Sequence, residues 1–218
     1  PPTKEQLEKV KDIEHPIFRQ HPFCDKTCLY VDKAYTISIP GIVPLDNDAY
    51  ETTGESASLA VASARLVGPC LVGYADILFR RYILDHLLET EGDIVLVVDA
   101  HGAGRHRVRP GDLVKCSRPY TGELLEDEPA RVTEFLPRVD AGADGEWIGL
   151  VKLSARGAER VGREIEAMRA DATLARADLP ELFQRLLVAG ERLDVAWING
   201  HWLDVNDAFD LAQARNFL

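Results

Sequence analysis

The sequence lacks any apolar run close to the roughly 20 residues that a transmembrane helix needs. It also begins with no basic stretch followed by an apolar core, the pattern of a signal peptide. We therefore expect a cytoplasmic protein with no membrane partner. Cysteine is scarce, and in a reducing compartment the thiols of Cys24, Cys28, Cys70 and Cys116 should stay free. Cys24 and Cys28 lie near His21, but no second pair has zinc-site spacing, so a zinc site is not favoured.

The sequence also has fewer basic than acidic residues. The 218 residues include 25 Lys and Arg against 36 Asp and Glu, a formal net charge of −11. This balance argues against a nucleic-acid partner, because such binding depends on neutralising phosphates. The sequence contains no GxSxG elbow, HExxH, Walker loop or GxGxxG motif, and no internal repeat or long linker. Its length and composition are those of one globular domain over residues 1–218.

Helical and extended patterns alternate along the chain, which predicts strand-helix-strand crossovers. The expected architecture is a three-layer α/β fold, with a largely parallel (mixed) sheet flanked by helices. The expected helices cover residues 4–14, 55–66, 77–88, 158–169, 179–189 and 207–216. The expected strands lie within 28–39 and at 70–72, 93–99, 146–154 and 195–198, with 202–205 strand-like.

Asp76 follows shortly after the apolar run 70–72, which we interpret as a strand buried on both faces. Ligands of open α/β sheets collect at the carboxyl ends of strands, so this carboxylate is placed to bind a metal or a substrate. Asp76 could also be the N-cap of the helix expected over 77–88, and the two roles can coexist.

The local charge reverses between His101 and Arg118, where basic residues such as Arg105 and Lys115 surround a single acid, Asp112. An anionic ligand would favour this region. The alternative is a solvated edge hairpin whose charges prevent aggregation.

Near the end of the chain, Asp204 and Asn206 are two residues apart in an extended segment and should share a face that could hold an ion. Asp207 and Asp210 have the spacing of the N-cap and the N3 acid of the last helix, so we interpret both as structural.

Several segments stand in a characteristic order: NDAY at 47–50 and TGESASL at 53–59, YADILF at 74–79, GDIVLVVD at 92–99, GEWIG at 145–149 and GHWLDVN at 200–206. Together they resemble the sugar-nucleotidyltransferase-like family. Within it, they look most like the phosphonate cytidylyltransferases found alone or fused to phosphoenolpyruvate mutase. The resemblance implies a nucleotide-diphospho-sugar transferase-like fold and Mg²⁺ as cofactor. The implied reaction transfers CMP from CTP to a small phosphonate, of 2-aminoethylphosphonate or 2-hydroxyethylphosphonate type, and releases pyrophosphate.

The same resemblance implies roles for individual residues. Asp76 and Asp204, with Asn206, match the magnesium-binding positions, and the two aspartates are the expected catalytic residues. The implied nucleotide-binding residues are Ser58 and Asp76, and the implied acceptor-binding residues are Arg105, Lys115 and Glu146. A phosphoenolpyruvate mutase domain and a second copy of the chain are further partners that the resemblance allows.

The amino end departs from the family pattern. Family members carry a glycine-rich loop with an Arg, followed by a Pro-Lys pair, whereas residues 1–35 match neither and no glycine precedes Gly41. Lys26 and Lys33 are candidates for phosphate contacts only because they are basic. The sequence leaves open a truncation or interruption, a degenerate domain and a rearranged amino end. A non-catalytic scaffolding domain beside a mutase, and a nucleotidyltransferase acting on phosphocholine or a sugar phosphate, are the competing functions.

Overall fold

A computed structural model describes residues 18–20, 27–29, 43, 45–100, 112–122, 129–136, 142–215 and 217. The chain divides into two units, residues 1–46 and 47–218. In the first unit, β1 (Phe18–Gln20) pairs antiparallel with β2 (Thr27–Leu29). The helix expected over 4–14 and most of the segment 28–39 lie outside the described residues. The single domain over 1–218 stays a prediction.

The second unit is built on a six-stranded sheet. Its strands are β3 (Cys70–Gly73), β5 (Ile94–Asp99), β6 (Leu113–Cys116), β7 (Val132–Leu136), β8 (Gly145–Leu153) and β9 (Asp194–Ile198). The long strand β8 organises the sheet, because it pairs with β5 along one edge and with β6 and β3 at opposite ends of the other edge. Strand β9 extends the sheet beyond β5, and β7 extends it beyond β6.

The sheet is mixed, as predicted. Among the described strands of this sheet only β5 and β9 are parallel neighbours and the other pairs are antiparallel, so the expectation of a largely parallel sheet is wrong. Strands β3 and β5 run in the same direction, as a strand-helix-strand crossover requires, but β8 lies between them in the opposite direction. The crossover therefore makes β3 and β5 parallel in direction, but the two strands are not hydrogen-bonded neighbours.

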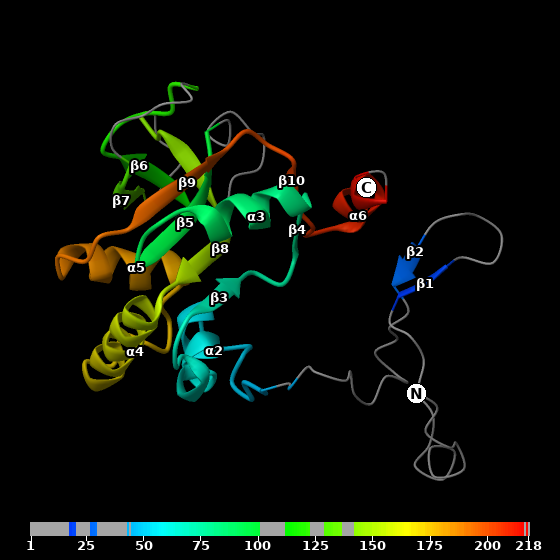
Figure 1. Ribbon diagram of the computed structural model, residues 1–218. Coiled ribbons are helices and arrows are strands. Elements are labelled where there is room, and N and C mark those ends of the chain that lie inside the picture. Colours follow the sequence, from blue (N-terminus) through cyan, green and yellow to red (C-terminus); the bar gives the residue numbers. More distant parts are fainter. Residues whose placement is uncertain are drawn as a thin grey trace, which may run out of the picture. The chain divides into compact units, whose positions relative to one another are not determined.

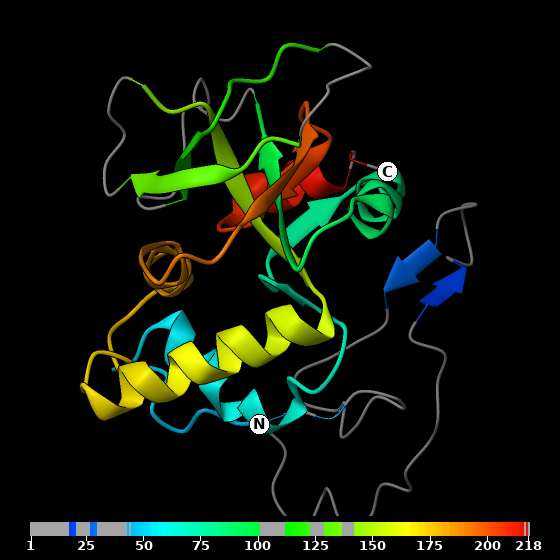
Figure 2. The ribbon, with the colours of Figure 1, turned by 60° about the vertical axis from the view of Figure 1, so that its left-hand side comes forward.

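Helices cover both faces of the sheet, which makes three layers (Figure 1). The alternating residues Ile94, Leu96 and Val98 of β5 pack with α4 (Ala155–Ala170) and α5 (Leu179–Val188). The intervening Val95 and Val97 pack with α3 (Arg81–Glu89) on the other face. Figure 2 shows α2 (Glu55–Val61) beside α4, on the same side of the sheet. The predicted three-layer α/β class is confirmed.

Local capping signals place two of the helices where the sequence predicts them. Asp178 and Glu181 form a complete capping box at the start of α5. Asp207 caps α6 (Ala208–Ala214) by accepting from the N–H groups of Phe209 and Asp210. The structural role expected for Asp207 is therefore confirmed. In the described part of the chain, no helix combines the length and the apolar character needed to cross a membrane.

Two predictions around Asp76 are wrong. Strand β3 is not buried on both faces: its residues alternate between half-buried and exposed, because β3 pairs only with β8 among the described residues. The helix expected from residue 77 begins instead at Arg81, with Arg80 as its N-cap, so Asp76 does not cap it. Residues Ile77–Phe79 form strand β4, which pairs with β10 (Trp202–Asp204). Pairing with a distant strand thus decides the local conformation.

Candidate functional site

The β4–β10 ribbon brings together the two aspartates that the sequence singles out. Asp204 is paired with Ile77, the residue after Asp76. The N–H of Val205 donates a hydrogen bond of 2.8 Å to the backbone oxygen of Asp76. Asp76 lies in the turn between β3 and β4, and both aspartates are half-buried. Two residues 128 positions apart in sequence are therefore neighbours in the structure.

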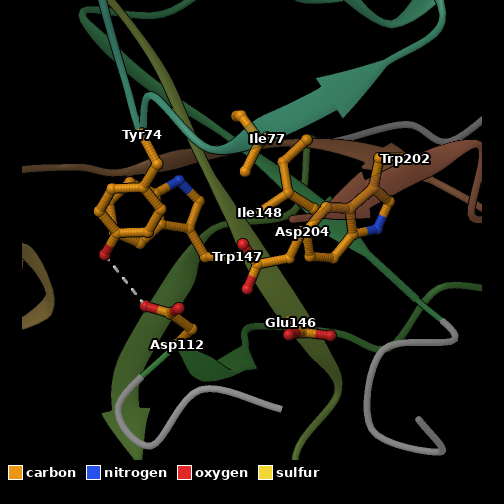
Figure 3. A pocket seen from close by; sticks show the side chains of 8 residues that line it. All are labelled: Tyr74, Ile77, Asp112, Glu146, Trp147, Ile148, Trp202 and Asp204. Carbon is orange, nitrogen blue, oxygen red and sulfur yellow. Dashed lines mark hydrogen bonds between the residues drawn. The ribbon is translucent and has the colours of Figure 1, made fainter. Parts of the chain in front are cut away.

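A pocket lies beside this ribbon, with an empty volume of about 170 Å³ that includes open solvent (Figure 3). Its lining combines acidic and aromatic side chains with two isoleucines: Tyr74, Ile77, Asp112, Glu146, Trp147, Ile148, Trp202 and Asp204. The carboxylate of Asp204 points toward the side on which Glu146 and Asp112 lie. Asp76 is not one of the lining residues. The described lining therefore contains three carboxylates and no positively charged side chain.

Two of the acidic residues come from the sheet itself. Glu146 lies near the start of β8. It is buried, like nearly all residues of this central strand. Asp112 directly precedes β6 and is also buried, and its backbone oxygen accepts from the N–H of Trp147 at 2.8 Å. Glu146 was expected at the site, whereas Asp112 was noted only as the lone acid of a basic run. That isolation is the one sequence signal that could have indicated it.

Tyr74 is the residue that fixes one wall of the pocket. Its hydroxyl donates to the Oδ1 atom of Asp112 at 3.3 Å and lies 3.4 Å from the Oε2 atom of Glu55. Its ring centroid is 5.3 Å from that of Trp147. The ring fills a recess at Gly149, where an added Cβ would lie 1.9 Å from the Cδ2 atom of Tyr74. Tyr74 therefore connects the start of α2, through Glu55, with the acidic pocket.

Asn206 lies beside Asp204, as their spacing predicts. Its Nδ2 atom donates to the Oδ2 atom of Asp204 at 2.7 Å. The backbone N–H of Asn206 donates to Asp210 at 3.1 Å, which anchors this residue to the first turn of α6. The end of β10 is thus held by the helix that follows it.

The other residues implied by the resemblance lie outside the pocket or outside the described chain. Ser58 is exposed on α2, and its hydroxyl accepts from Asn47 at 3.0 Å. Lys115 is exposed on β6, in the β6–β7 hairpin at one edge of the sheet. Most of the basic run, residues 101–111, lies outside the described residues, so its two interpretations stay predictions. Arg105 lies outside the described residues.

The oxygen atoms near the ribbon are of the type that Mg²⁺ prefers. Asp76 and Asp204 offer carboxylates and Asn206 offers an amide oxygen, whereas soft sulfur ligands are absent from this set. Among the residues that the structure describes, no three His, Cys, Asp or Glu side chains are close enough together to hold a metal ion alone. Mg²⁺ commonly binds one or two carboxylates and completes its shell with water and substrate phosphates. The donor set therefore fits a magnesium ion that arrives with a phosphorylated substrate.

Several solved structures that match this fold are nucleotidyltransferases. The inositol-1-phosphate CTP transferase from T. maritima matches with a TM-score of 0.56 and 16% identity, over 78% of this chain and 63% of that one. The CTP:phosphocholine cytidylyltransferase from Streptococcus pneumoniae matches with a TM-score of 0.52 and 14% identity, over 78% of this chain and 66% of that one. A UDP-glucose pyrophosphorylase matches with a TM-score of 0.55 and 12% identity, over 76% and 61%.

These matches show the fold, which is nucleotide-diphospho-sugar transferase-like, as the sequence predicts. The chain spans less than two thirds of the length of each of the three proteins. No protein-family model matches the sequence, and no curated protein matches it either.

Proposed function

We propose that the chain is a nucleotidyltransferase that moves CMP from CTP to a small phosphonate and releases pyrophosphate. The observation that carries this proposal is the pairing of β4 with β10, which makes Asp76 and Asp204 neighbours at the rim of a nucleotidyltransferase-like fold. The order of the sequence motifs supports the choice of cytidine nucleotide and phosphonate.

In this reaction a phosphonate oxygen attacks the α-phosphorus of CTP, and the bond from that phosphorus to the bridging oxygen of the β-phosphate breaks. Asp76 and Asp204, with Asn206, would hold Mg²⁺. When bound, this ion supplies screening between the two anionic reactants and stabilises charge on the phosphoryl oxygens. The chain needs no side-chain nucleophile, because it binds and orients two reactants whose direct reaction is enough. Ser58 is proposed to contact the nucleotide, and Arg105, Lys115 and Glu146 are proposed to face the acceptor.

The pocket favours one kind of acceptor. Beside Asp204, which is proposed to hold Mg²⁺, Asp112 and Glu146 contribute carboxylates, and Tyr74 and Trp202 offer aromatic surface. An ammonium group is attracted both by carboxylates and by aromatic faces, whereas a hydroxyl group gains less from either. We therefore expect 2-aminoethylphosphonate to be a better acceptor than 2-hydroxyethylphosphonate.

The test is release of pyrophosphate from CTP and Mg²⁺ in the presence of each acceptor. We expect activity with 2-aminoethylphosphonate, and a loss of about 100-fold or more in Asp76→Asn and Asp204→Asn, which keep the shape of the side chain but remove its charge. Asp85→Asn is the matched control, because Asp85 is an exposed residue of α3 whose carboxylate pairs with Arg81 on the same helix. No pyrophosphate with any acceptor, together with no heat on titrating CTP and Mg²⁺, would refute the proposal.

Absence of glycine before Gly41 favours a second candidate, a non-catalytic domain that binds or scaffolds, for example beside a phosphoenolpyruvate mutase. This candidate predicts no turnover in the same assay. Turnover abolished by Asp76→Asn would eliminate it. Including phosphocholine and sugar phosphates as acceptors separates the phosphonate proposal from transfer to another phosphorylated acceptor, the class named for the proteins of similar fold.

A further inference from the structure

Asn47 connects the turn before α2 with α2 itself. Its Nδ2 atom donates to the hydroxyl oxygens of Thr53 at 2.9 Å and of Ser58 at 3.0 Å. Its Oδ1 atom accepts from the backbone N–H of Ala49 at 3.1 Å. Asn47 opens the NDAY segment of the sequence, and the proposed function gives this segment no role. Its three hydrogen bonds hold the side chain in one position beside Ser58.

The N–H of Ala49 determines which way the amide of Asn47 points. A backbone N–H can only donate, so the amide atom that faces it at 3.1 Å must be the oxygen. The NH₂ group then faces the two hydroxyl groups and has one hydrogen for each of them. Both Thr53 and Ser58 therefore accept a hydrogen bond from Asn47.

A hydroxyl that accepts from Asn47 keeps its own hydrogen for another partner, because it has one hydrogen and two lone pairs. Thr53 donates its hydrogen to the backbone oxygen of Ala49 at 3.0 Å. Ser58 is exposed on α2, and in the part of the chain that the structure describes no acceptor takes its hydrogen. A ligand that covers Ser58 must supply an acceptor, because an unpaired donor shielded from water is costly.

This requirement distinguishes the two pyrimidine bases. The ring atom N3 is an acceptor in cytosine, whereas in uracil it carries a hydrogen and is a donor. The O2 atom accepts in both bases, and at position 4 a donor would favour the oxygen of uracil over the amine of cytosine. Of these three positions, only N3 lets a hydroxyl donor favour cytosine.

We infer that Asn47 is a positioning residue: it fixes Ser58 as a hydrogen-bond donor to N3 of cytosine, and so makes the chain prefer CTP to UTP. The contact of Ser58 with the nucleotide and the choice of CTP rest on the proposed function. The direction of the Asn47 amide does not rest on it.

The test uses substitutions in the full chain. Asn47→Asp keeps an oxygen that accepts from Ala49 but replaces the NH₂ group by a second oxygen, so Ser58 donates to residue 47 and turns its hydrogen away from the base. Ser58→Ala removes the hydroxyl. Thr52→Val is the matched control, because the Thr52 hydroxyl donates to the backbone oxygen of Ala49 at 3.1 Å in the same turn. Among the described residues, Thr52 makes no hydrogen bond with Asn47 or Ser58.

The first readout is the ratio of the dissociation constants for UTP and CTP, measured by calorimetry with Mg²⁺. Both nucleotides carry the same triphosphate, so the charge added in Asn47→Asp cancels in the ratio. We expect the preference for CTP to fall by about 10-fold or more in Asn47→Asp and in Ser58→Ala, and to stay unchanged in Thr52→Val. The double variant should have the ratio of Ser58→Ala, because Asn47 acts on the base through Ser58.

An unchanged ratio in Asn47→Asp would overturn the inference, and so would an equal loss of affinity for the two nucleotides. A chain that shows the expected ratios but releases no pyrophosphate would refute the proposed reaction and leave the selection of cytosine standing. Release of pyrophosphate at equal rates from CTP and UTP would do the reverse. Binding of neither nucleotide would refute both.

The second readout needs no nucleotide. Amide hydrogen exchange of Ala49, followed by nuclear magnetic resonance, reports the acceptor at residue 47. We expect Asn47→Ala to speed this exchange by about 10-fold, because it removes the acceptor, and Asn47→Asp to leave it unchanged. Equal exchange in Asn47→Ala and the wild type would show that the amide oxygen does not face Ala49, and the inferred direction of the Ser58 hydrogen would fall with it.

Discussion

The absence of a side chain at Gly149 shapes one wall of the pocket. Gly149 has a φ of 80°, and a Cβ there would overlap the ring of Tyr74. We expect Gly149→Ala to lower the free energy of unfolding by about 2 to 4 kcal/mol, because it adds steric overlap to an unfavourable backbone conformation. Displacing Tyr74 should also break its hydrogen bond to Asp112. Denaturant unfolding measures the first effect.

The control for this substitution is Gly68→Ala. Gly68 has a φ of 90°, but no heavy atom lies within 4 Å of the position of an added Cβ. Gly68→Ala should therefore lower the free energy of unfolding only by the backbone cost of a positive φ, about 1 to 2 kcal/mol. Equal losses in the two variants would show that contact with Tyr74 adds nothing at Gly149.

Cys116 makes stability depend on pH in the alkaline range. Burial, and secondly the nearby carboxylate of Asp144, raise the pKa of its thiol to about 12. In the unfolded chain the thiol titrates near about pH 8.5, so above that pH the unfolded state binds fewer protons than the folded state. The free energy of unfolding should therefore fall as pH rises through this window, by up to about 1.4 kcal/mol per pH unit from this group.

Denaturant unfolding at about pH 8 and about pH 10 tests this expectation. Cys116→Ala removes the titrating thiol, so its free energy of unfolding should fall less over the same interval. An identical pH dependence in both proteins would contradict the expected shift.

At the scale of elements, helix α4 is positioned by the residue that precedes β5. The N–H of Ser154 donates to the backbone oxygen of Asp93 at 2.8 Å, and its hydroxyl donates to the Oδ1 atom of Asp93 at 2.6 Å. Gly157, in the first turn of α4, approaches the same residue so closely that a Cβ would lie 2.0 Å from the backbone oxygen of Asp93. Close contact between helix and strand is possible only because residue 157 has no side chain.

Two glycines of this one helix give a matched comparison. We expect Gly157→Ala to lower the free energy of unfolding by about 1 to 3 kcal/mol through overpacking. At Gly162 no heavy atom lies within 4 Å of an added Cβ. Gly162→Ala should therefore raise stability by about 0.5 to 1 kcal/mol, because alanine loses less backbone entropy in a helix. Thermal or denaturant unfolding measures both, and a destabilising Gly162→Ala would contradict this account of α4.

Elements with a strong local signal could be predicted from the sequence, and elements defined by distant partners could not. The apolar run of β5 predicts a buried strand, and the capping box of α5 predicts the start of a helix, without reference to distant residues. Strand β4 has only three residues, and its conformation depends on β10, which lies far along the chain. The same reasoning applies to Asp112, which joins the pocket because β6 and β3 share an edge of β8. The family resemblance of the sequence, not its local pattern, implied that Asp76 and Asp204 act together, and their carboxylate geometry depends on the ribbon.

At the scale of the whole molecule, the two hydrophobic cores of the described chain lie within the unit 47–218. One core packs between the sheet and the α4–α5 face, and the other packs between the sheet and α3. The described residues of the first core begin at Leu59, and those of the second begin at Ile77. Buried apolar surface is the main stabilising contribution in a domain, and the described part of that surface lies in this unit.

We therefore expect a fragment of residues 47–218 to unfold in one cooperative transition, with a free energy within about 1 kcal/mol of that of the full chain. Circular dichroism and denaturant unfolding of the two proteins side by side measure this. A broad transition, or a fragment that binds a hydrophobic dye in native buffer, would show that residues 1–46 complete the core.

Titrating the folded fragment with CTP and Mg²⁺ then tests the contribution of residues 1–46 to nucleotide binding. A loss of affinity relative to the full chain would favour a rearranged amino end in which Lys26 or Lys33 contacts phosphate, because only residues 1–46 differ between the two proteins.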